Sequence, residues 1–327
     1  MSIVEVAQQF ADEVLFPVAV ATDASDVVPL GLLDAMAEAG LYGIVAPPDA
    51  GGISADFGTV CAVQEALASG CLTTAFLWAQ HIGLVRALAA SDDQDLRARW
   101  LKPLASGEVR AGLALGGALP TPSLRALPDG SGWLLDGVSP FVSGWGRIDV
   151  VHAAARTPDD EIIWLIVDAE ENDVVRAERL RLAALNATAT VRLTFDRLPV
   201  SADRVAGRHP ASGVTPPEVL RVHAALALGV AARCCRMIGP TGLDAELAAL
   251  PAELDSLGPG TAAARAAAGE LAVRAAGALM VTAGSRSLLA ADQPRRLARE
   301  TLFTLVYALR PASRSAVLTR LGAPELA

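Results

Sequence analysis

Side chains that could do acid–base or metal chemistry are few and scattered in this sequence. The four histidines lie far apart: His81, His152, His209 and His223. The four cysteines include no Cys-x-x-Cys pair: Cys61, Cys71, Cys234 and Cys235. Protein metal sites usually draw on closely spaced ligand pairs, so we predict no metal site and no disulfide framework. Reduced, buried thiols fit a cytoplasmic protein, which is the compartment we expect.

Two single groups are candidates for proton transfer. Glu218 follows Pro216-Pro217 at the expected start of a helix, where a carboxylate also complements the positive end of the helix dipole. Glu218 is therefore either a general base or an acid that stabilises a helix start. His81 lies in an apolar stretch and is either a hydrogen-bonded core histidine or a site group.

Composition excludes several classes of function. The chain has 327 residues, 4% aromatic residues and a net charge of −9, which disfavours a nucleic-acid partner because phosphates are repelled and stacking platforms are few. The acids Glu5, Asp12 and Glu13 precede any apolar run, so we expect no signal peptide. The uncharged stretch 66–85 is long enough to cross a bilayer. Its polar residues and Gly70 favour a buried pair of helices instead, so we expect no membrane span.

The spacing of apolar residues divides the chain into three parts. Residues 1–107 show helical spacing with proline and glycine at the helix ends, apart from a short run at 41–46 that we expect to be extended. Residues 108–208 change to short alternating or β-branched runs separated by turns such as 129–132. Residues 209–327 return to long helices rich in alanine and leucine. We therefore predict an α+β multidomain fold, with an N-terminal helical domain, a central antiparallel β-barrel or sheet, and a C-terminal helical bundle.

Several strings spread over the chain resemble the acyl-CoA dehydrogenase family. Residues 39–52 resemble its Gly-Leu-x-Gly-Ile-x-x-Pro stretch followed by Gly-Gly, and residues 99–108 resemble the passage into its β-domain. Residues 132–149 resemble its Gly-Trp-x-Leu-x-Gly segment with the Trp-Ile-Thr turn. Residues 299–310 resemble its C-terminal Arg-Asp-Ala and Tyr-Glu-Gly-Thr signature. The chain is identified as a short, divergent member of this family.

The resemblance implies FAD as the cofactor. By match, Phe141 would pack on the isoalloxazine and the Ser143 hydroxyl would donate to flavin N5, with Val142 between them. Leu115 and Gly116 would begin the loop that lies against the ring. This loop is shortened here compared with the family.

Two departures from the family bear on activity. The family's catalytic Glu removes the proton alpha to a thioester, and Ala308 stands at its position beside the retained Tyr307. The family's Arg-x-x-Phe-Gly element, which holds the FAD pyrophosphate, is missing, and Arg233 or Arg236 could replace it.

Three functions are compatible with these features. The first is an acyl-CoA dehydrogenase-like flavin oxidoreductase acting on an acyl-CoA or acyl-carrier-protein thioester, in a homo-oligomer or as the base-lacking subunit of a mixed oligomer. The second is a flavin monooxygenase on the same fold, which needs no base at the alpha carbon and for which His81 is the candidate proton donor. The third is a non-catalytic scaffold subunit.

Overall fold

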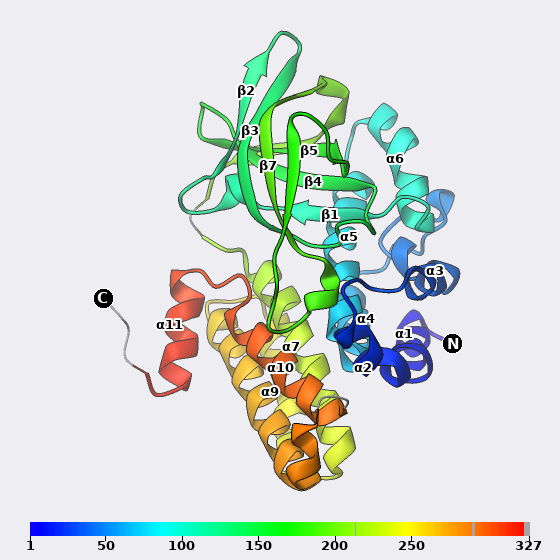
Figure 1. Cartoon of the computed structure of the whole chain (residues 1–327), viewed down its shortest axis with the longest axis vertical. Helices are drawn as coiled ribbons and strands as arrows, with labels where there is room; N and C mark the ends of the chain where they lie inside the picture. The colour runs from blue at the N-terminus through cyan, green and yellow to red at the C-terminus, as the bar shows by residue number, and fades with distance from the viewer. Residues whose placement is uncertain (213, 290–291, 324–327) are drawn as a thin grey trace.

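The computed structural model describes residues 1–212, 214–289 and 292–323 of the chain. A β-domain occupies one end of the molecule, the N-terminal helices lie beside and below it, and the C-terminal helices form the opposite end (Figure 1). The order of helices, sheet and helices is the predicted one, and the predicted fold class is confirmed.

Six helices build the N-terminal part: α1 (Ile3–Phe10), α2 (Phe16–Ala24), α3 (Leu30–Glu38), α4 (Phe57–Gly70), α5 (Leu72–Ala89) and α6 (Gln94–Ser106). The run at 41–46 is not extended as predicted. Leu41–Gly43 form a 3₁₀ turn instead, and the indole Nε1 of Trp78 donates to the carbonyl of Leu41 at 2.8 Å. A short apolar run does not by itself distinguish a strand from a buried turn.

The uncharged stretch 66–85 forms a buried helix pair, as predicted. The break falls at Cys71, whose backbone is extended with φ −154° and ψ 110°. Gly70 lies against the π-helical turn that joins α1 to α2. A Cβ at Gly70 would be 2.7 Å from the carbonyl oxygen of Ala11, so only glycine permits this close approach.

The central domain is one 8-stranded sheet with the order β6-β7-β3-β2-β4-β5-β8 and with β1 paired to β4. Its strands are β1 (Ala111–Ala114), β2 (Leu124–Asp129), β3 (Gly132–Val142), β4 (Val150–Arg156), β5 (Glu161–Asp168), β6 (Val175–Arg179), β7 (Val191–Val200) and β8 (Val205–Pro210). Strand β4 pairs in parallel with both β1 and β2. The sheet is therefore mixed, and β6 and β8 leave it open. The predicted purely antiparallel pairing and barrel closure are corrected on these points, because a strand's own alternation does not reveal which neighbour it pairs with.

Strand β4 is apolar on both faces because both faces are covered. Val151 and Ala153 lie in the core enclosed by the curved sheet. Val150 packs on the other face with Leu84 of α5 and Leu104 of α6. The β-domain is thus fixed to the N-terminal helices through a second apolar layer.

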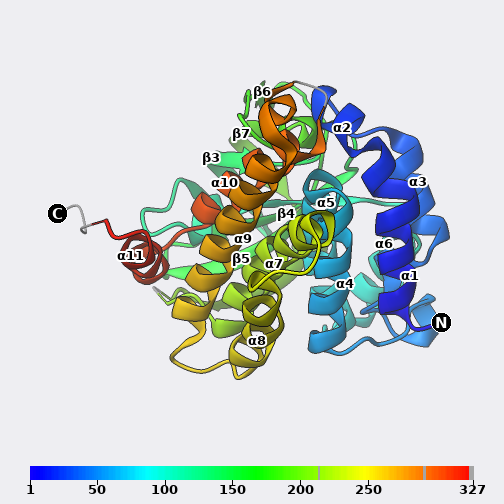
Figure 2. The ribbon, with the colours of Figure 1, turned by 90° about the horizontal axis from the view of Figure 1, so that it is seen from below.

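Five helices follow the sheet: α7 (Pro217–Ile238), α8 (Leu243–Asp255), α9 (Thr261–Ala283), α10 (Gln293–Val306) and α11 (Pro311–Arg320). Helix α9 lies among α7, α10 and α11 (Figure 2). The segment Thr261–Leu288 is long and apolar enough to cross a membrane by length and composition, and 44% of its most apolar window is buried in the protein. Its packing against α7, α8, α10 and α11 accounts for this apolar character. Sequence reasoning missed α8, which carries Pro251 within it.

Candidate functional site

The turn after α10 carries the position at which the family resemblance expects the catalytic Glu. The helix ends at Val306, and Ala308 adopts a left-handed backbone with φ 50°. A residue with a Cβ pays about 1–2 kcal/mol for this conformation. The guanidinium of Arg265 donates from Nη2 to the carbonyl of Tyr307 at 2.7 Å, so α9 fixes the turn from the side.

Aromatic rings surround Tyr307 at this turn. Its ring centroid lies 4.9 Å from that of Phe76, 4.9 Å from that of His223 and 5.2 Å from that of Phe303. The amide Nε2 of Gln80 approaches the Tyr307 hydroxyl at 3.5 Å. Burial raises the pKa of Tyr307, so the phenol stays protonated and neutral.

His223 is a site residue that sequence reasoning named only among the scattered histidines. Its Nδ1 is buried and has no hydrogen-bond partner among the residues that the structure describes. Burial first, and then the charges of Arg265 and Arg310, lower the pKa of His223 to about 3. No motif or spacing in the sequence singled out this residue, because a lone histidine in an apolar helix usually belongs to the core.

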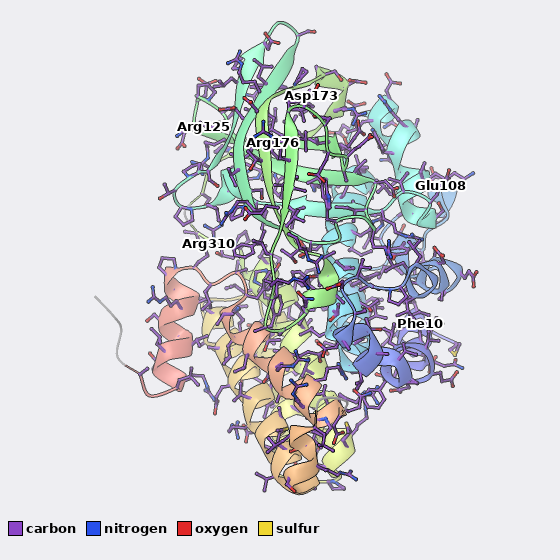
Figure 3. The ribbon with its side chains drawn as sticks, in the orientation of Figure 1. Phe10, Glu108, Arg125, Asp173, Arg176 and Arg310 are labelled. Carbon is purple, nitrogen blue, oxygen red and sulfur yellow. The ribbon has the colours of Figure 1, made fainter. Side chains whose placement is uncertain are left out.

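Arg310 closes the site from the β-domain side. It lies where the chain leads into α11, at the lower edge of the β-domain (Figure 3). Its Nη2 donates to the carbonyl of Ala118 at 2.6 Å. Ala118 belongs to the short 3₁₀ turn Gly116–Ala118 that follows β1. Arg310 thereby joins the loop predicted to face a flavin to the turn that carries Ala308.

The two predicted proton-transfer candidates lie elsewhere. The Nδ1 of His81 accepts from the backbone N–H of Ala111 at 3.1 Å, and its Nε2 donates to the carbonyl of Leu104 at 3.1 Å. Burial lowers the pKa of His81 to about 4. Both ring nitrogens are thus used in holding the helices to the β-domain, and none is left for proton transfer. Glu218 is exposed on the first turn of α7, the position of an acid that stabilises a helix start.

The hydroxyl of Ser143 points into the protein. Thr188 Oγ1 donates to the carbonyl of Leu185 at 2.8 Å, because a carbonyl can only accept. Thr188 Oγ1 and Thr190 Oγ1 are 2.8 Å apart, so the Thr190 proton must lie between them. Ser143 Oγ and Thr190 Oγ1 are 2.7 Å apart, which leaves the proton of Ser143 directed at Thr190. Donation to a flavin would require this hydroxyl to rotate.

The other predicted flavin contacts differ in exposure. Phe141 is 64% exposed near the end of β3. Val142 is buried in the sheet core and offers a ligand only its backbone. Leu115 is half-buried. A Cβ on Gly116 would lie 2.5 Å from the carbonyl oxygen of Val138, so this glycine is required by the packing of the turn on β3.

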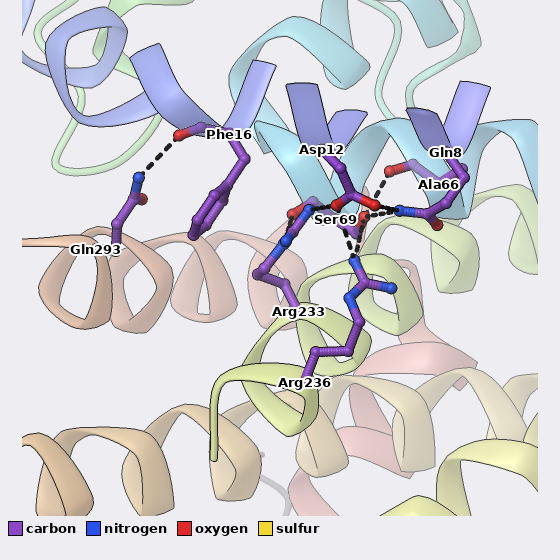
Figure 4. Close-up of polar contacts among 8 residues, drawn as sticks. All are labelled: Gln8, Asp12, Phe16, Ala66, Ser69, Arg233, Arg236 and Gln293. Carbon is purple, nitrogen blue, oxygen red and sulfur yellow. Dashed lines mark hydrogen bonds and ion pairs between the residues drawn. The ribbon is translucent and has the colours of Figure 1, made fainter. Parts of the chain in front are cut away.

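The two arginines considered for the missing pyrophosphate element are both tied to the N-terminal helices (Figure 4). Arg233 is ion-paired with Asp12, donates from Nε to the Ser69 carbonyl at 2.6 Å, and lies over the ring of Phe16. Its side chain is 9% exposed, so Arg233 is not available to a phosphate. Arg236 donates to Ser69 Oγ at 2.8 Å, yet its side chain is 43% exposed beside a hollow of about 720 Å³.

The cysteines and the remaining acids add no second site. The four cysteines are buried and free, and burial raises the pKa of Cys61 to about 11 and of Cys234 to about 12. Thiols of this kind are unreactive. Within residues 1–212, 214–289 and 292–323, no group of three or more His, Cys, Asp or Glu side chains is arranged to hold a metal ion.

Comparison with known proteins gives consistent relatives. Residues 1–108 match the family model for the acyl-CoA dehydrogenase N-terminal domain. A (2S)-methylsuccinyl-CoA dehydrogenase of Cereibacter sphaeroides is 27% identical over 46% of this chain and 28% of its own length. The aligned part of this chain spans between 28% and 64% of the length of the curated relatives that it matches.

Two solved structures share the fold over nearly the whole chain. Butyryl-CoA dehydrogenase from Megasphaera elsdenii superposes with a TM-score of 0.81 at 17% identity, covering 98% of this chain and 97% of that one. A dibenzothiophene monooxygenase from Paenibacillus sp. A11-2 superposes with a TM-score of 0.77 at 17% identity, with the same coverage of 98% and 97%. At such identities the likeness establishes the fold, and the chemistry has to be argued from the site.

Proposed function

We propose that this chain, whose residues 1–108 match the family model for the acyl-CoA dehydrogenase N-terminal domain, is a subunit of an acyl-CoA dehydrogenase-like flavin oxidoreductase that acts on an acyl thioester. We propose further that the subunit lacks its own base and completes its site in a mixed oligomer. The observation that carries this proposal is the turn after α10, where Ala308 offers a methyl group in place of a carboxylate.

His223 is a poor substitute for the missing base. A base at the alpha carbon must lie near the proton and must hold it once removed. The pKa of His223, about 3, lies below the ordinary value of about 4.3 for a glutamate. The positive charges of Arg265 and Arg310 oppose formation of an imidazolium. The chain alone is therefore expected to bind a thioester without removing its alpha proton.

The end of β3 suits part of a flavin site. The exposed ring of Phe141 is available to lie against a planar ring system, and Ser143 can donate to it only after turning away from Thr190. Arg236 is the partly exposed cation where the family's pyrophosphate element is missing. Bound FAD would supply the hydride acceptor of the reaction.

Restoring the carboxylate tests the proposal directly. The FAD-loaded chain and its Ala308→Glu and Ala308→Gln variants are mixed anaerobically with butyryl-CoA, and the visible flavin absorbance is followed. We expect bleaching by Ala308→Glu only, since Ala308→Gln has the same size without a base. The same assay with a full-length acyl-CoA dehydrogenase of the same organism that keeps its catalytic Glu but has been made unable to bind flavin tests completion in a mixed oligomer.

Two results would contradict the proposal. Bleaching of the unchanged chain at the rate of Ala308→Glu would mean that another base is present. Failure to bind flavin, alone and with a full-length relative, would leave a non-catalytic scaffold subunit as the function.

A flavin monooxygenase is the second candidate, and the fold shared with the dibenzothiophene monooxygenase favours it. The absence of a carboxylate from Ala308 also favours it, since a monooxygenase reaction needs no base at an alpha carbon. His81 cannot serve as its proton donor in the observed arrangement, because both ring nitrogens bond the backbone. Oxygen uptake by the chain with reduced flavin, together with an oxygenated product, would favour this candidate over the first.

A further inference from the structure

We propose that the site around Tyr307 and Ala308 binds the free carboxylate of a small organic ligand. Arg265, Arg310 and His223 surround a turn from which the chain's own carboxylate is absent. The carboxylate belongs either to a free acid or to the distal end of an acyl thioester. The assignment of this ligand as a substrate rests on the proposed function, whereas the binding of a carboxylate requires no flavin.

Arg265 carries the charge argument. Four arginines are buried within the described part of the chain: Arg221, Arg233, Arg265 and Arg296. Three of them contact a carboxylate, from Glu65 and Asp255, from Asp12 and from Glu300 respectively. Arg265, 4% exposed, has no such partner among the residues described. A buried charge without a counter-charge is costly, so an anion that reached Arg265 would be bound favourably.

The polar atoms beside Arg265 are also incompletely satisfied. Its Nε and the Nδ1 of His223 are buried without a partner in the described ranges. Burial lowers the pKa of the Arg265 guanidinium, and burial first, then the charges of Arg265 and Arg310, lower that of His223. A carboxylate accepts several hydrogen bonds at once and would oppose both shifts.

A purely structural role accounts for only part of this cluster. Arg265 donates to the last carbonyl of α10, which suits the negative end of a helix dipole. That bond leaves the Nε of Arg265 and the imidazole of His223 unexplained. Arg310 is held beside this cluster by its bond to the carbonyl of Ala118. Ala308 and Arg310 are partly exposed, so a ligand would have to approach the buried nitrogens of Arg265 and His223 past this turn.

Binding is tested on the flavin-free chain by calorimetry with propionate and with propionamide, its uncharged analogue. We expect propionate to bind and propionamide not to bind. Arg310→Gln should weaken propionate binding about tenfold or more, the effect of losing one charge-assisted hydrogen bond. Arg314→Gln, four residues later on an exposed face of α11, is the matched control and should bind as the unchanged chain does.

A second pair of variants avoids dependence on one arginine. Ala308→Glu supplies an internal carboxylate and should abolish propionate binding, while Ala308→Gln should not. Equal binding of propionate and propionamide, or propionate binding that survives Ala308→Glu, would overturn the proposal. Because no flavin is present, these results do not depend on whether the proposed redox function is correct.

The source of the carboxylate is resolved by displacement of propionate. Tighter competition by succinyl-CoA than by propionyl-CoA assigns the carboxylate to the acyl part of a thioester. Competition by succinate with no effect of either thioester assigns it to a free acid. If neither succinate nor either thioester displaces propionate, propionate is not bound at a specific carboxylate site and the proposal is overturned.

Discussion

Replacing Ala308 by glycine should stabilise the protein, although glycine in most positions does the opposite. Ala308 has φ 50°, and relieving a left-handed conformation in a residue with a Cβ gains about 1–2 kcal/mol. The extra freedom of glycine in the unfolded chain costs about 0.5–1 kcal/mol. The net expectation is a gain of about 0.5 kcal/mol in the free energy of unfolding. Ala308 thus lowers the stability slightly, at the position where the family resemblance expects the catalytic Glu.

The assay is urea unfolding of Ala308→Gly beside a control. Ala252 is exposed inside α8, and Ala252→Gly should lower the free energy of unfolding by about 1 kcal/mol because it weakens a helix. The two variants are expected to shift the midpoint in opposite directions with an unchanged slope. If Ala308→Gly destabilises the protein as much as Ala252→Gly, the turn is not strained and the reasoning about Ala308 fails.

Three further predictions concern buried polar groups of the protein. Glu300 and Arg296 form an ion pair in which both side chains are 1% exposed. Glu300→Gln leaves the Arg296 charge without a counter-charge and should lower the free energy of unfolding by about 3–5 kcal/mol in urea titrations. The pKa of His81 is lowered from 6.5 to about 4 by burial, so its neutral form contributes stability above the unfolded pKa that is lost as the pH falls from 6.5 through the folded value. The acid limb of a stability–pH curve should therefore flatten in His81→Gln. Thr190→Val removes the hydrogen-bond acceptor of Ser143 and should lower the free energy of unfolding by about 1–2 kcal/mol, measured by thermal unfolding. Ser143→Ala should lower it by less, because Ser143 is only the last donor in this series of hydroxyl hydrogen bonds.

The elements that the sequence did not reveal share a physical cause. Strand β8 is an edge strand with half-buried or exposed residues and ends at Pro210, so it lacks the apolar alternation of a strand packed in a core. Strand β2 contains Pro128, and α8 contains Pro251. Strand β8 is held by β5, which lies far away in the sequence, whereas β2 pairs with the next strand β3 and α8 packs on its sequence neighbours α7 and α9. The proline in β2 and in α8 argues against each element when the local sequence is read alone.

The candidate site was only partly predictable. The absence of a carboxylate from Ala308 follows from the sequence and the family resemblance, and Tyr307 directly precedes it in the sequence. The importance of His223 was not seen, since a lone histidine in an apolar helix normally indicates a core residue. Its unpaired Nδ1 becomes evident only when α7, α9 and the turn after α10 are placed together.

What the sequence by itself determined is the order of helices, sheet and helices, the family resemblance and the missing base, because periodicity and residue identity are local properties. The tertiary structure alone decided how the polar groups are paired. The contact of Arg310 with Ala118 joins residues 192 positions apart, that of Arg265 with Tyr307 joins residues 42 apart, and that of Ser143 with Thr190 joins residues 47 apart. Whether a buried arginine has a carboxylate, or a hydroxyl a free proton, depends on such long-range contacts, and a single sequence does not specify them.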